Sequence, residues 1–126
     1  MSLANYEPRH FSHEHVGDAV VISVLEERLS EEQNLEEFGT ELFAYIDQYD
    51  CRTVVLNCAQ VVYASSSAIG KLITLHRRVN RVEGRLAICS LQTSFVEILQ
   101  AARLYDYFQT ATTAEEAVEL LQSDTE

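Results

Sequence analysis

Short, nearly continuous apolar runs, each followed by a segment of helical periodicity, constrain the fold of this chain more than any other feature. Two such runs cover residues 53–58 and 85–90. Runs of this kind are typical of parallel strands that are covered on both faces. The segments after them place apolar residues three and four positions apart, which is the spacing of an amphipathic helix. Strands that alternate with helices favour an α/β sheet.

The residues before position 30 predict an antiparallel hairpin. Residues 11–15 alternate in polarity, and residues 19–24 form a β-branched apolar run, as strands do. Gly17 and Asp18 supply a short turn between the two runs. The sheet is therefore expected to open with an antiparallel pair.

Four segments show the features of helices. In the first, Ser30 and Gln33 fit a capping box that satisfies free backbone N–H groups at a helix start. The second is the clearest, with Gly84 as its expected C-cap. The predicted helices are residues 31–48, residues 65–82, a segment with Phe95, Ile98, Leu99 and Ala102, and a last segment that starts at the capping box of residues 113–116.

These elements define one fold class. With a short last strand near residues 107–110, the predicted order is β-β-α-β-α-β-α-β-α. We expect a single small α/β domain with a mixed, mostly parallel β-sheet and helices on its faces; 126 residues with 47% hydrophobic content suit it. The domain is expected to span residues 4–123, with residues 1–3 set aside as a candidate cloning remnant and residues 124–126 as a tail.

Charge is distributed unevenly along the chain, whose formal net charge is -11. Residues 51–105 hold seven basic and two acidic residues, and the segments on either side are strongly acidic. Direct binding of nucleic acid is not expected, because such proteins neutralise phosphates with an excess of basic residues. Most of the basic excess falls on the second helix, opposite its apolar side. We interpret it as one exposed basic face, made of Lys71, Arg77, Arg78 and Arg81.

Neither a membrane span nor a disulfide framework is expected. No apolar run approaches the roughly 20 residues of a bilayer crossing, and the N-terminus lacks a signal pattern. The three cysteines, Cys51, Cys58 and Cys89, are odd in number and form no CxxC pair. Cys58 and Cys89 lie in apolar runs, where small core residues are expected. We therefore expect a cytoplasmic protein that needs no cofactor.

The serine run at residues 65–67 is the strongest candidate for a functional site. Ligands in open α/β sheets gather where strands end and helices begin, and this run lies at such a junction. A phosphoryl group on a serine there would meet free N–H groups and the positive end of the helix dipole. Helix capping explains one of the three serines, and on the residues alone it is the favoured interpretation of the run.

The start of the second helix resembles the motif of the STAS domain of bacterial anti-sigma factor antagonists. The residues here are Ser65-Ser66-Ser67-Ala68-Ile69-Gly70, followed by Lys71. The family carries Asp-Ser-Ser/Thr-Gly-Leu-Gly at this place, and the first serine of its motif is phosphorylated. The resemblance extends over almost the whole chain and includes the element order. It implies phosphorylation of Ser66, with Ser67 as the alternative, and partner contact through residues 65–71.

Two residues depart from the family motif. Ser65 stands where the family has Asp, and Ala68 where it has Gly. Ser65 can accept a hydrogen bond but carries no charge, while Ala68 has less backbone freedom and a higher helix propensity than Gly. The resemblance implies partner switching in transcription control: the unmodified domain binds an anti-sigma factor, often a serine kinase, and phosphorylation by that kinase reverses the binding.

Three other functions remain open from the residues. An enzyme is disfavoured, because Ser66 lacks a Gly-x-Ser-x-Gly setting and His76 lies roughly 15 Å further along the same helix. A nucleotide or small-ligand module would bind weakly through the serine loop and basic face, since the four dispersed glycines form no phosphate-binding loop. A phosphorylation-independent scaffold in a signalling assembly would dock through the acidic first helix or the basic face.

Histidines near the N-terminus form a candidate metal cluster. His13 and His15 share one face of a predicted strand, and His10 lies nearby. Imidazole is a common zinc ligand, but polar residues on an exposed edge strand are the favoured interpretation. We therefore predict no metal site.

Overall fold

The computed structural model describes residues 10–30, 32–48 and 52–123, and its centre is a five-stranded sheet. The strands of this sheet are β1 (Phe11–Val16), β2 (Ala19–Val24), β4 (Thr53–Asn57), β6 (Arg85–Cys89) and β7 (Gln109–Ala111), and they lie in that order. β1 and β2 form the predicted antiparallel hairpin, in which Gly17 turns with a φ of 62°. The other neighbours pair in parallel, which confirms the predicted mixed, mostly parallel sheet.

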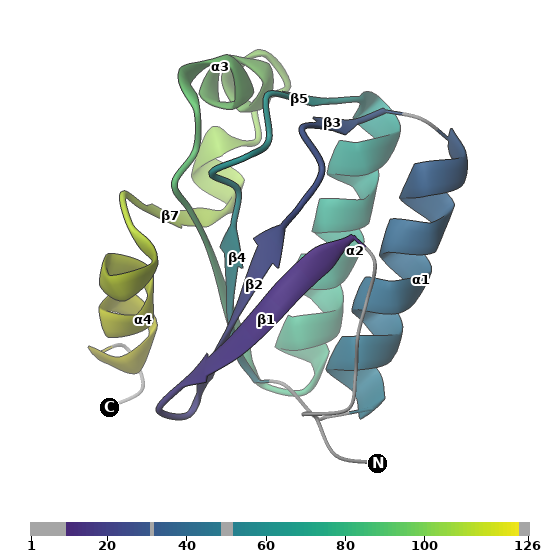
Figure 1. The fold of residues 1–126 in the computed structure, drawn as a ribbon. Helices are drawn as coiled ribbons and strands as arrows, with labels where there is room; N and C mark the ends of the chain where they lie inside the picture. The colour runs from purple at the N-terminus through teal and green to yellow at the C-terminus, as the bar shows by residue number, and fades with distance from the viewer. Residues whose placement is uncertain (1–9, 31, 49–51, 124–126) are drawn as a thin grey trace.

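Helices cover the two faces of the sheet unequally (Figure 1). α1 (Glu32–Gln48) and α2 (Ser66–Arg81) lie side by side over one face, and α4 (Ala114–Ser123) covers the other. α3 (Thr93–Ala101) lies at the end of the sheet where α2 begins. The four predicted helices are therefore present in the predicted order. In the described part of the chain, no helix combines the length and hydropathy that a bilayer crossing requires.

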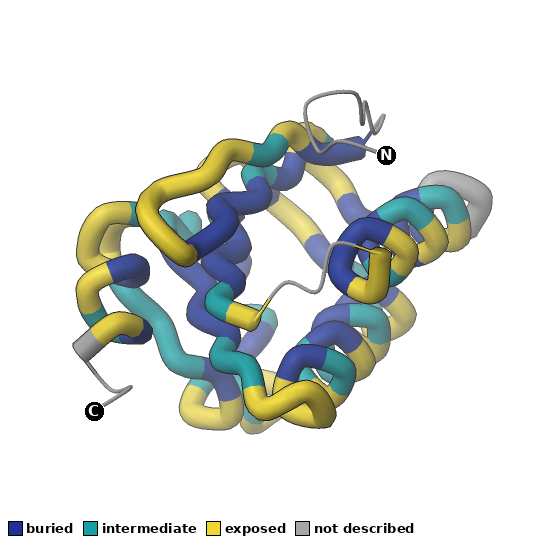
Figure 2. Tube along the Cα trace, turned by 90° about the horizontal axis from the view of Figure 1, so that it is seen from below, coloured by how far each residue is buried: buried dark blue, intermediate teal, exposed yellow. Residues whose placement is uncertain are grey.

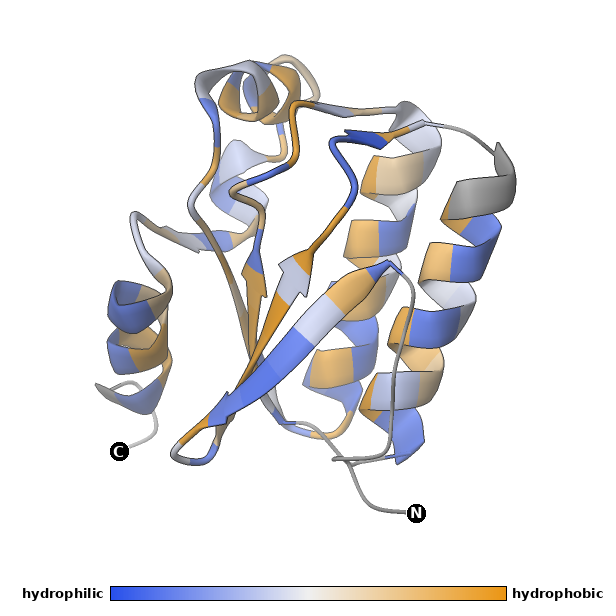
Figure 3. Cartoon of the chain, viewed as in Figure 1, coloured by the Kyte–Doolittle hydropathy of each residue, from blue (hydrophilic) through white to orange (hydrophobic). Residues whose placement is uncertain are grey.

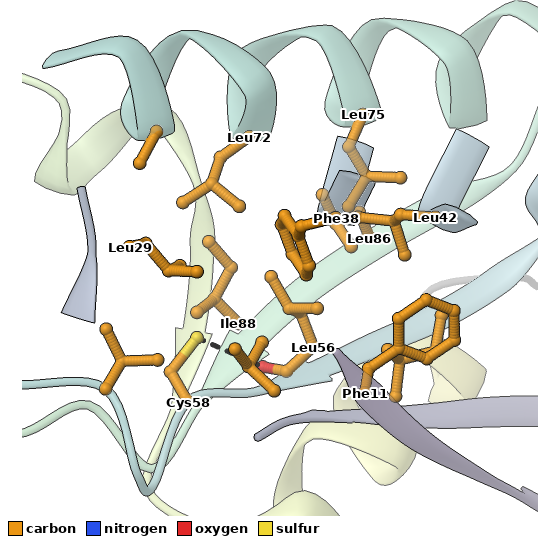
Figure 4. Packing of buried hydrophobic residues seen from close by; sticks show 14 of the residues in the cluster. Phe11, Leu29, Phe38, Leu42, Leu56, Cys58, Leu72, Leu75, Leu86 and Ile88 are labelled. Carbon is orange, nitrogen blue, oxygen red and sulfur yellow. Dashed lines mark hydrogen bonds between the residues drawn. The ribbon is translucent and has the colours of Figure 1, made fainter. Parts of the chain in front are cut away.

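Alternation of side chains along the strands divides the interior into two cores. Neighbours such as Val54 and Val55 belong to opposite faces of the sheet. The larger core lies beneath α1 and α2, where Leu72 and Leu75 point toward strand residues such as Leu56 (Figure 4). The smaller core lies beneath α4 and consists of Ala19, Val21, Val55, Ala87, Cys89, Ala117, Val118 and Leu121.

Burial and hydropathy follow these layers. The central strands are buried, and the outer sides of the helices are exposed (Figure 2). β2 and β4 are mainly hydrophobic, whereas the edge strand β1 is more hydrophilic (Figure 3). Cys58 and Cys89 are buried, as predicted, and are free thiols that lie in different cores; Cys51 lies outside the described residues. Burial raises the pKa of both thiols, so both stay protonated at neutral pH.

Two short elements differ from the sequence prediction. A small parallel sheet joins β3 (Arg28–Leu29) to β5 (Tyr63–Ala64), and the hydrophobic pattern did not predict this pairing. The strand predicted at residues 107–110 is partly a 3-10 helix, η2 (Tyr105–Tyr107), and β7 follows it. Both differences concern elements of two or three residues, which are too short to carry a period.

The end of α2 also differs, because Gly84 is not its C-cap. The helix ends at Arg81, and Glu83 rather than Gly84 takes the left-handed conformation, with a φ of 61°. A Cβ on Gly84 would lie 2.5 Å from the carbonyl oxygen of Arg52. Glycine is therefore needed here for the close approach of two backbone segments.

Candidate functional site

Ser65 is the N-cap of α2. Its backbone is extended, with φ -76° and ψ 170°, and its Oγ accepts a hydrogen bond from the Ala68 N–H at 3.2 Å. The Ser65 N–H in turn donates to the Leu29 carbonyl at 2.9 Å, which fixes the helix start against β3. The capping role expected for one serine of the run is thus filled by Ser65.

The other two serines of the run are not used by the cap. Ser66 and Ser67 are the first two residues of α2, and both are exposed. Neither hydroxyl has a hydrogen-bond partner among the residues that the structure describes. Both hydroxyls are therefore open to a modifying enzyme or a partner protein.

The two residues that depart from the family motif both have a structural role. Ser65 keeps the capping function that Asp also performs well. Ala68 is only 2% exposed, and its methyl group packs into the larger core. The motif therefore retains its helix start, although the negative charge beside Ser66 is absent.

A loop next to the serines presents two exposed apolar side chains. Val62 and Tyr63 are 39% and 38% exposed, and the guanidinium of Arg28 lies over the Tyr63 ring at 4.7 Å. The N–H groups of Val62 and Tyr63 both donate to the Glu27 carbonyl, at 2.7 and 3.2 Å. β5 leads directly into α2, so this loop and the start of α2 lie at the same end of the molecule (Figure 1). We call Arg28, Val62, Tyr63 and Ser66 the apical surface.

The start of α3 holds this loop in place. The Ser94 hydroxyl donates to the Val62 carbonyl, and the Gln92 amide donates to the Ala59 carbonyl, both at 2.7 Å. The sequence analysis did not identify Ser94, Gln92 or the exposed apolar pair. Polar residues at a predicted helix start were a signal for such contacts, but their acceptors lie more than 30 residues away.

A groove of about 630 Å³ runs between α1 and α2, beside the serines. Its α2 wall is one side of the helix, formed by Ser67 and by the residues three, four and seven positions after it. Its α1 wall includes the apolar side chains of Leu35 and Phe43. The lining residues are Ser30, Leu35, Glu36, Phe43, Ser67, Gly70, Lys71 and Thr74.

The predicted basic face is divided between this groove and the solvent. Lys71 lies 3.5 Å from Glu36 of α1. Arg78 donates to Asp47 at 2.7 Å and lies over the Phe43 ring at 4.7 Å. Of the four predicted residues, Arg77 and Arg81 are exposed, whereas Lys71 and Arg78 are half-buried and contact residues of α1.

The prediction that the N-terminal histidines are exposed edge-strand residues is wrong for His10. This residue is 6% exposed, and its ring nitrogens lie 2.6 Å from Glu26 and 3.1 Å from Glu37. Its backbone N–H donates to Glu41 at 3.2 Å. Burial acts to lower the pKa of His10, but the two hydrogen bonds to carboxylates outweigh it, so this pKa lies above its usual value.

The remaining histidines are separate from the serines. His13 lies 3.2 Å from the Tyr45 hydroxyl, and His15 is exposed. His76 packs against Tyr107, with ring centroids 4.7 Å apart, and burial lowers its pKa. Across residues 10–30, 32–48 and 52–123, no group of three or more His, Cys, Asp or Glu side chains is arranged to hold a metal ion.

Sequence comparison identifies the family. The family model of the STAS domain matches residues 14–117, and the chain belongs to the STAS domain family. No curated protein matches the sequence significantly. The fold described above agrees with this membership.

Solved structures with the same fold include anti-sigma factor antagonists. A candidate antagonist from Thermotoga maritima has a TM-score of 0.78 and 18% identity, over 89% of this chain and 94% of its own. An anti-sigma factor antagonist (STAS) domain protein from Planctomyces limnophilus has a TM-score of 0.78 and 23% identity, over 89% and 97% of the two chains. The Bacillus cell fate determinant SpoIIAA in its phosphorylated form has a TM-score of 0.64 and 24% identity, over 86% and 96%.

Proposed function

We propose that this chain is an anti-sigma factor antagonist that binds an anti-sigma factor with serine kinase activity in the bacterial cytoplasm. In this proposal phosphorylation of Ser66 ends the binding, and the chain regulates transcription without being an enzyme. The observation that carries the proposal is the position of Ser66. It directly follows the capping serine, opens α2, and has an exposed hydroxyl beside two exposed apolar side chains.

The chemistry of the apical surface supports such a switch. Val62 and Tyr63 offer apolar area that a partner would cover, and an unmodified Ser66 adds no charge to it. A phosphate adds a charge of about -1.5 to -2 at pH 7. Inside a protein contact this charge needs a cationic partner, and without one its desolvation opposes binding.

The structural neighbours also support the proposal. SpoIIAA, an anti-sigma factor antagonist, is known in an unphosphorylated and a phosphorylated form. Both forms share the fold of this chain, with TM-scores of 0.74 and 0.64. A fold that accommodates phosphorylation in a relative is a suitable scaffold for the same modification at Ser66.

Site mapping by mass spectrometry tests the proposal. The chain is isolated from its own cells, grown with and without stress, and we expect phosphate on Ser66 in one of the two conditions. The cognate kinase with ATP should label the wild-type chain and a Ser12→Ala control, whose change lies on β1, but not Ser66→Ala.

Two results would favour the alternative functions. A chain that carries no phosphate under any condition would contradict the switch and favour a phosphorylation-independent scaffold. Saturable binding of ATP or GTP to the isolated chain would favour a nucleotide-binding module.

A further inference from the structure

Ser66 and Ser67 differ in the side chains that face them from the next turn of α2. Residues four positions apart on a helix are neighbours, with Cβ atoms about 5–6 Å apart. Ser67 has Lys71 at this position, and both residues line the groove between α1 and α2. Ser66 has Gly70, where an added Cβ would find no heavy atom within 4 Å other than those of its chain neighbours and of the nearby backbone of α2. Within α2, Ser67 therefore has a cation in reach and Ser66 does not.

Lys71 is held in the groove, but its ion pair with Glu36 is weak. Its stem packs on α1, where a Cβ on Gly39 would lie 2.9 Å from the Lys71 Cδ, and its side chain is 23% exposed. The carboxylate that it meets, Glu36, is 3.5 Å away on a side chain that is 72% exposed. Ion pairs with so exposed a partner are weak, so a stronger anion can displace the carboxylate.

We propose that a phosphoryl group on Ser67 is captured by Lys71 within the groove, whereas a phosphoryl group on Ser66 has no lysine of α2 to capture it and stays on the apical surface. An anion four residues before a lysine is the favourable order on a helix, and a phosphate dianion attracts the ammonium more strongly than Glu36 does. The proposal rests on the proposed function and assigns the signal to Ser66 alone. Phosphate on Ser67 is partly neutralised within the chain.

The modification itself follows ordinary kinase chemistry. The serine oxygen forms a bond to the γ-phosphorus of a nucleoside triphosphate, and the bond to the β-phosphate oxygen breaks to release the diphosphate. The hydroxyl proton passes to a base of the kinase or to solvent. Capture by Lys71 then needs only the rotation of two side chains.

Phosphorus NMR of the intact chain tests this capture without a partner or a kinase. Phosphoserine is incorporated at position 66 or 67 during translation, and the midpoint of the second phosphate ionisation is measured by pH titration at low salt. A nearby cation favours the dianion, so we expect the midpoint at position 67 to lie about 0.3 pH unit below that at position 66. Lys71→Gln should remove the difference, and Lys71→Arg should keep it.

Arg77→Gln is the matched control, because it removes the same charge from an exposed position of the same helix. Equal midpoints at the two positions, or the same response to Arg77→Gln as to Lys71→Gln, would overturn the proposal. Either result would leave the role of Ser66 intact, because no partner takes part in the titration. Conversely, a chain never phosphorylated in its cells would contradict the proposed function and not the capture.

Discussion

Ser65 shows how one residue can depart from a family motif and keep its structural role. Its hydroxyl accepts the hydrogen bond from the Ala68 N–H that the start of α2 requires. Because Ser and Asp are similar N-caps, Ser65→Asp should change the free energy of unfolding by less than about 0.5 kcal/mol. Ser65→Ala should lower it by about 1 kcal/mol, since the N–H loses its acceptor. Urea unfolding measures both, and a Ser65→Ala chain as stable as a Ser67→Ala control would contradict the capping role.

His10 connects the start of β1 to the loop after β2 and to α1 through three carboxylates, Glu26, Glu37 and Glu41. Since its pKa in the folded chain is raised, its contribution to stability is fully present below about pH 6.5 and is lost as the pH rises through the folded-state value. A neutral ring can donate from only one nitrogen, so one of the two ring hydrogen bonds to carboxylate loses its proton.

We therefore predict that His10→Gln is less stable than the wild type by about 1–3 kcal/mol at pH 6. The difference should shrink at pH 9, because the neutral His10 ring can no longer donate hydrogen bonds to both carboxylates there. Urea unfolding at both pH values measures the difference, with the exposed His15→Gln as control. A difference that is constant or grows with pH would show that His10 is not held as the cation.

At the scale of elements, α1 and α2 are joined by Arg78, a cation predicted from the sequence to lie on an exposed face. Arg78 contacts both Asp47 and the Phe43 ring, whereas Arg77 is exposed. Arg78→Ala should lower the free energy of unfolding by about 1 kcal/mol through the loss of both contacts. Arg77→Ala should stay within about 0.5 kcal/mol of the wild type. Thermal or urea unfolding distinguishes the two, and equal effects would mean that the helix pair does not need Arg78.

The groove between these helices also explains why the serine run is not symmetric. Ser67 belongs to the groove, and Ser66 belongs to the end of the molecule that carries Val62 and Tyr63. A shift of one residue along α2 turns a side chain by about 100°. Adjacent serines of the same chemistry therefore have different surroundings.

At the scale of the whole molecule, the sequence predicted the elements whose apolar pattern extends over five or more residues. β4 and β6 are continuous apolar runs of strand length, all four helices repeat an apolar pattern over at least two turns, and each element is present. β3 and β5 were not predicted, since two residues carry no period and their pairing joins segments about 35 positions apart. Close backbone approaches such as that of Gly84 to Arg52 likewise depend on the assembled sheet.

The candidate site could be predicted only in part, because some of its features depend on residues that are distant in the sequence. The serine run lies within one local motif, so its place at the start of α2 followed from the sequence. The burial of His10 depends on Glu26 and Glu37, which come from a loop and a helix that only the fold brings together. The division of the basic face depends on the acidic residues of α1, and a pattern along α2 alone does not reveal them.

The central claim is that the charge state of Ser66 controls partner binding, and calorimetric titration tests it most directly. Each anti-sigma factor kinase encoded in the source genome is purified and titrated with the wild type, Ser66→Ala, Ser66→Glu and a Ser12→Glu control that adds the same charge on β1. We predict that one kinase binds the wild type, Ser66→Ala and Ser12→Glu with similar affinity and binds Ser66→Glu at least about tenfold more weakly. Equal affinities for Ser66→Ala and Ser66→Glu would contradict the account.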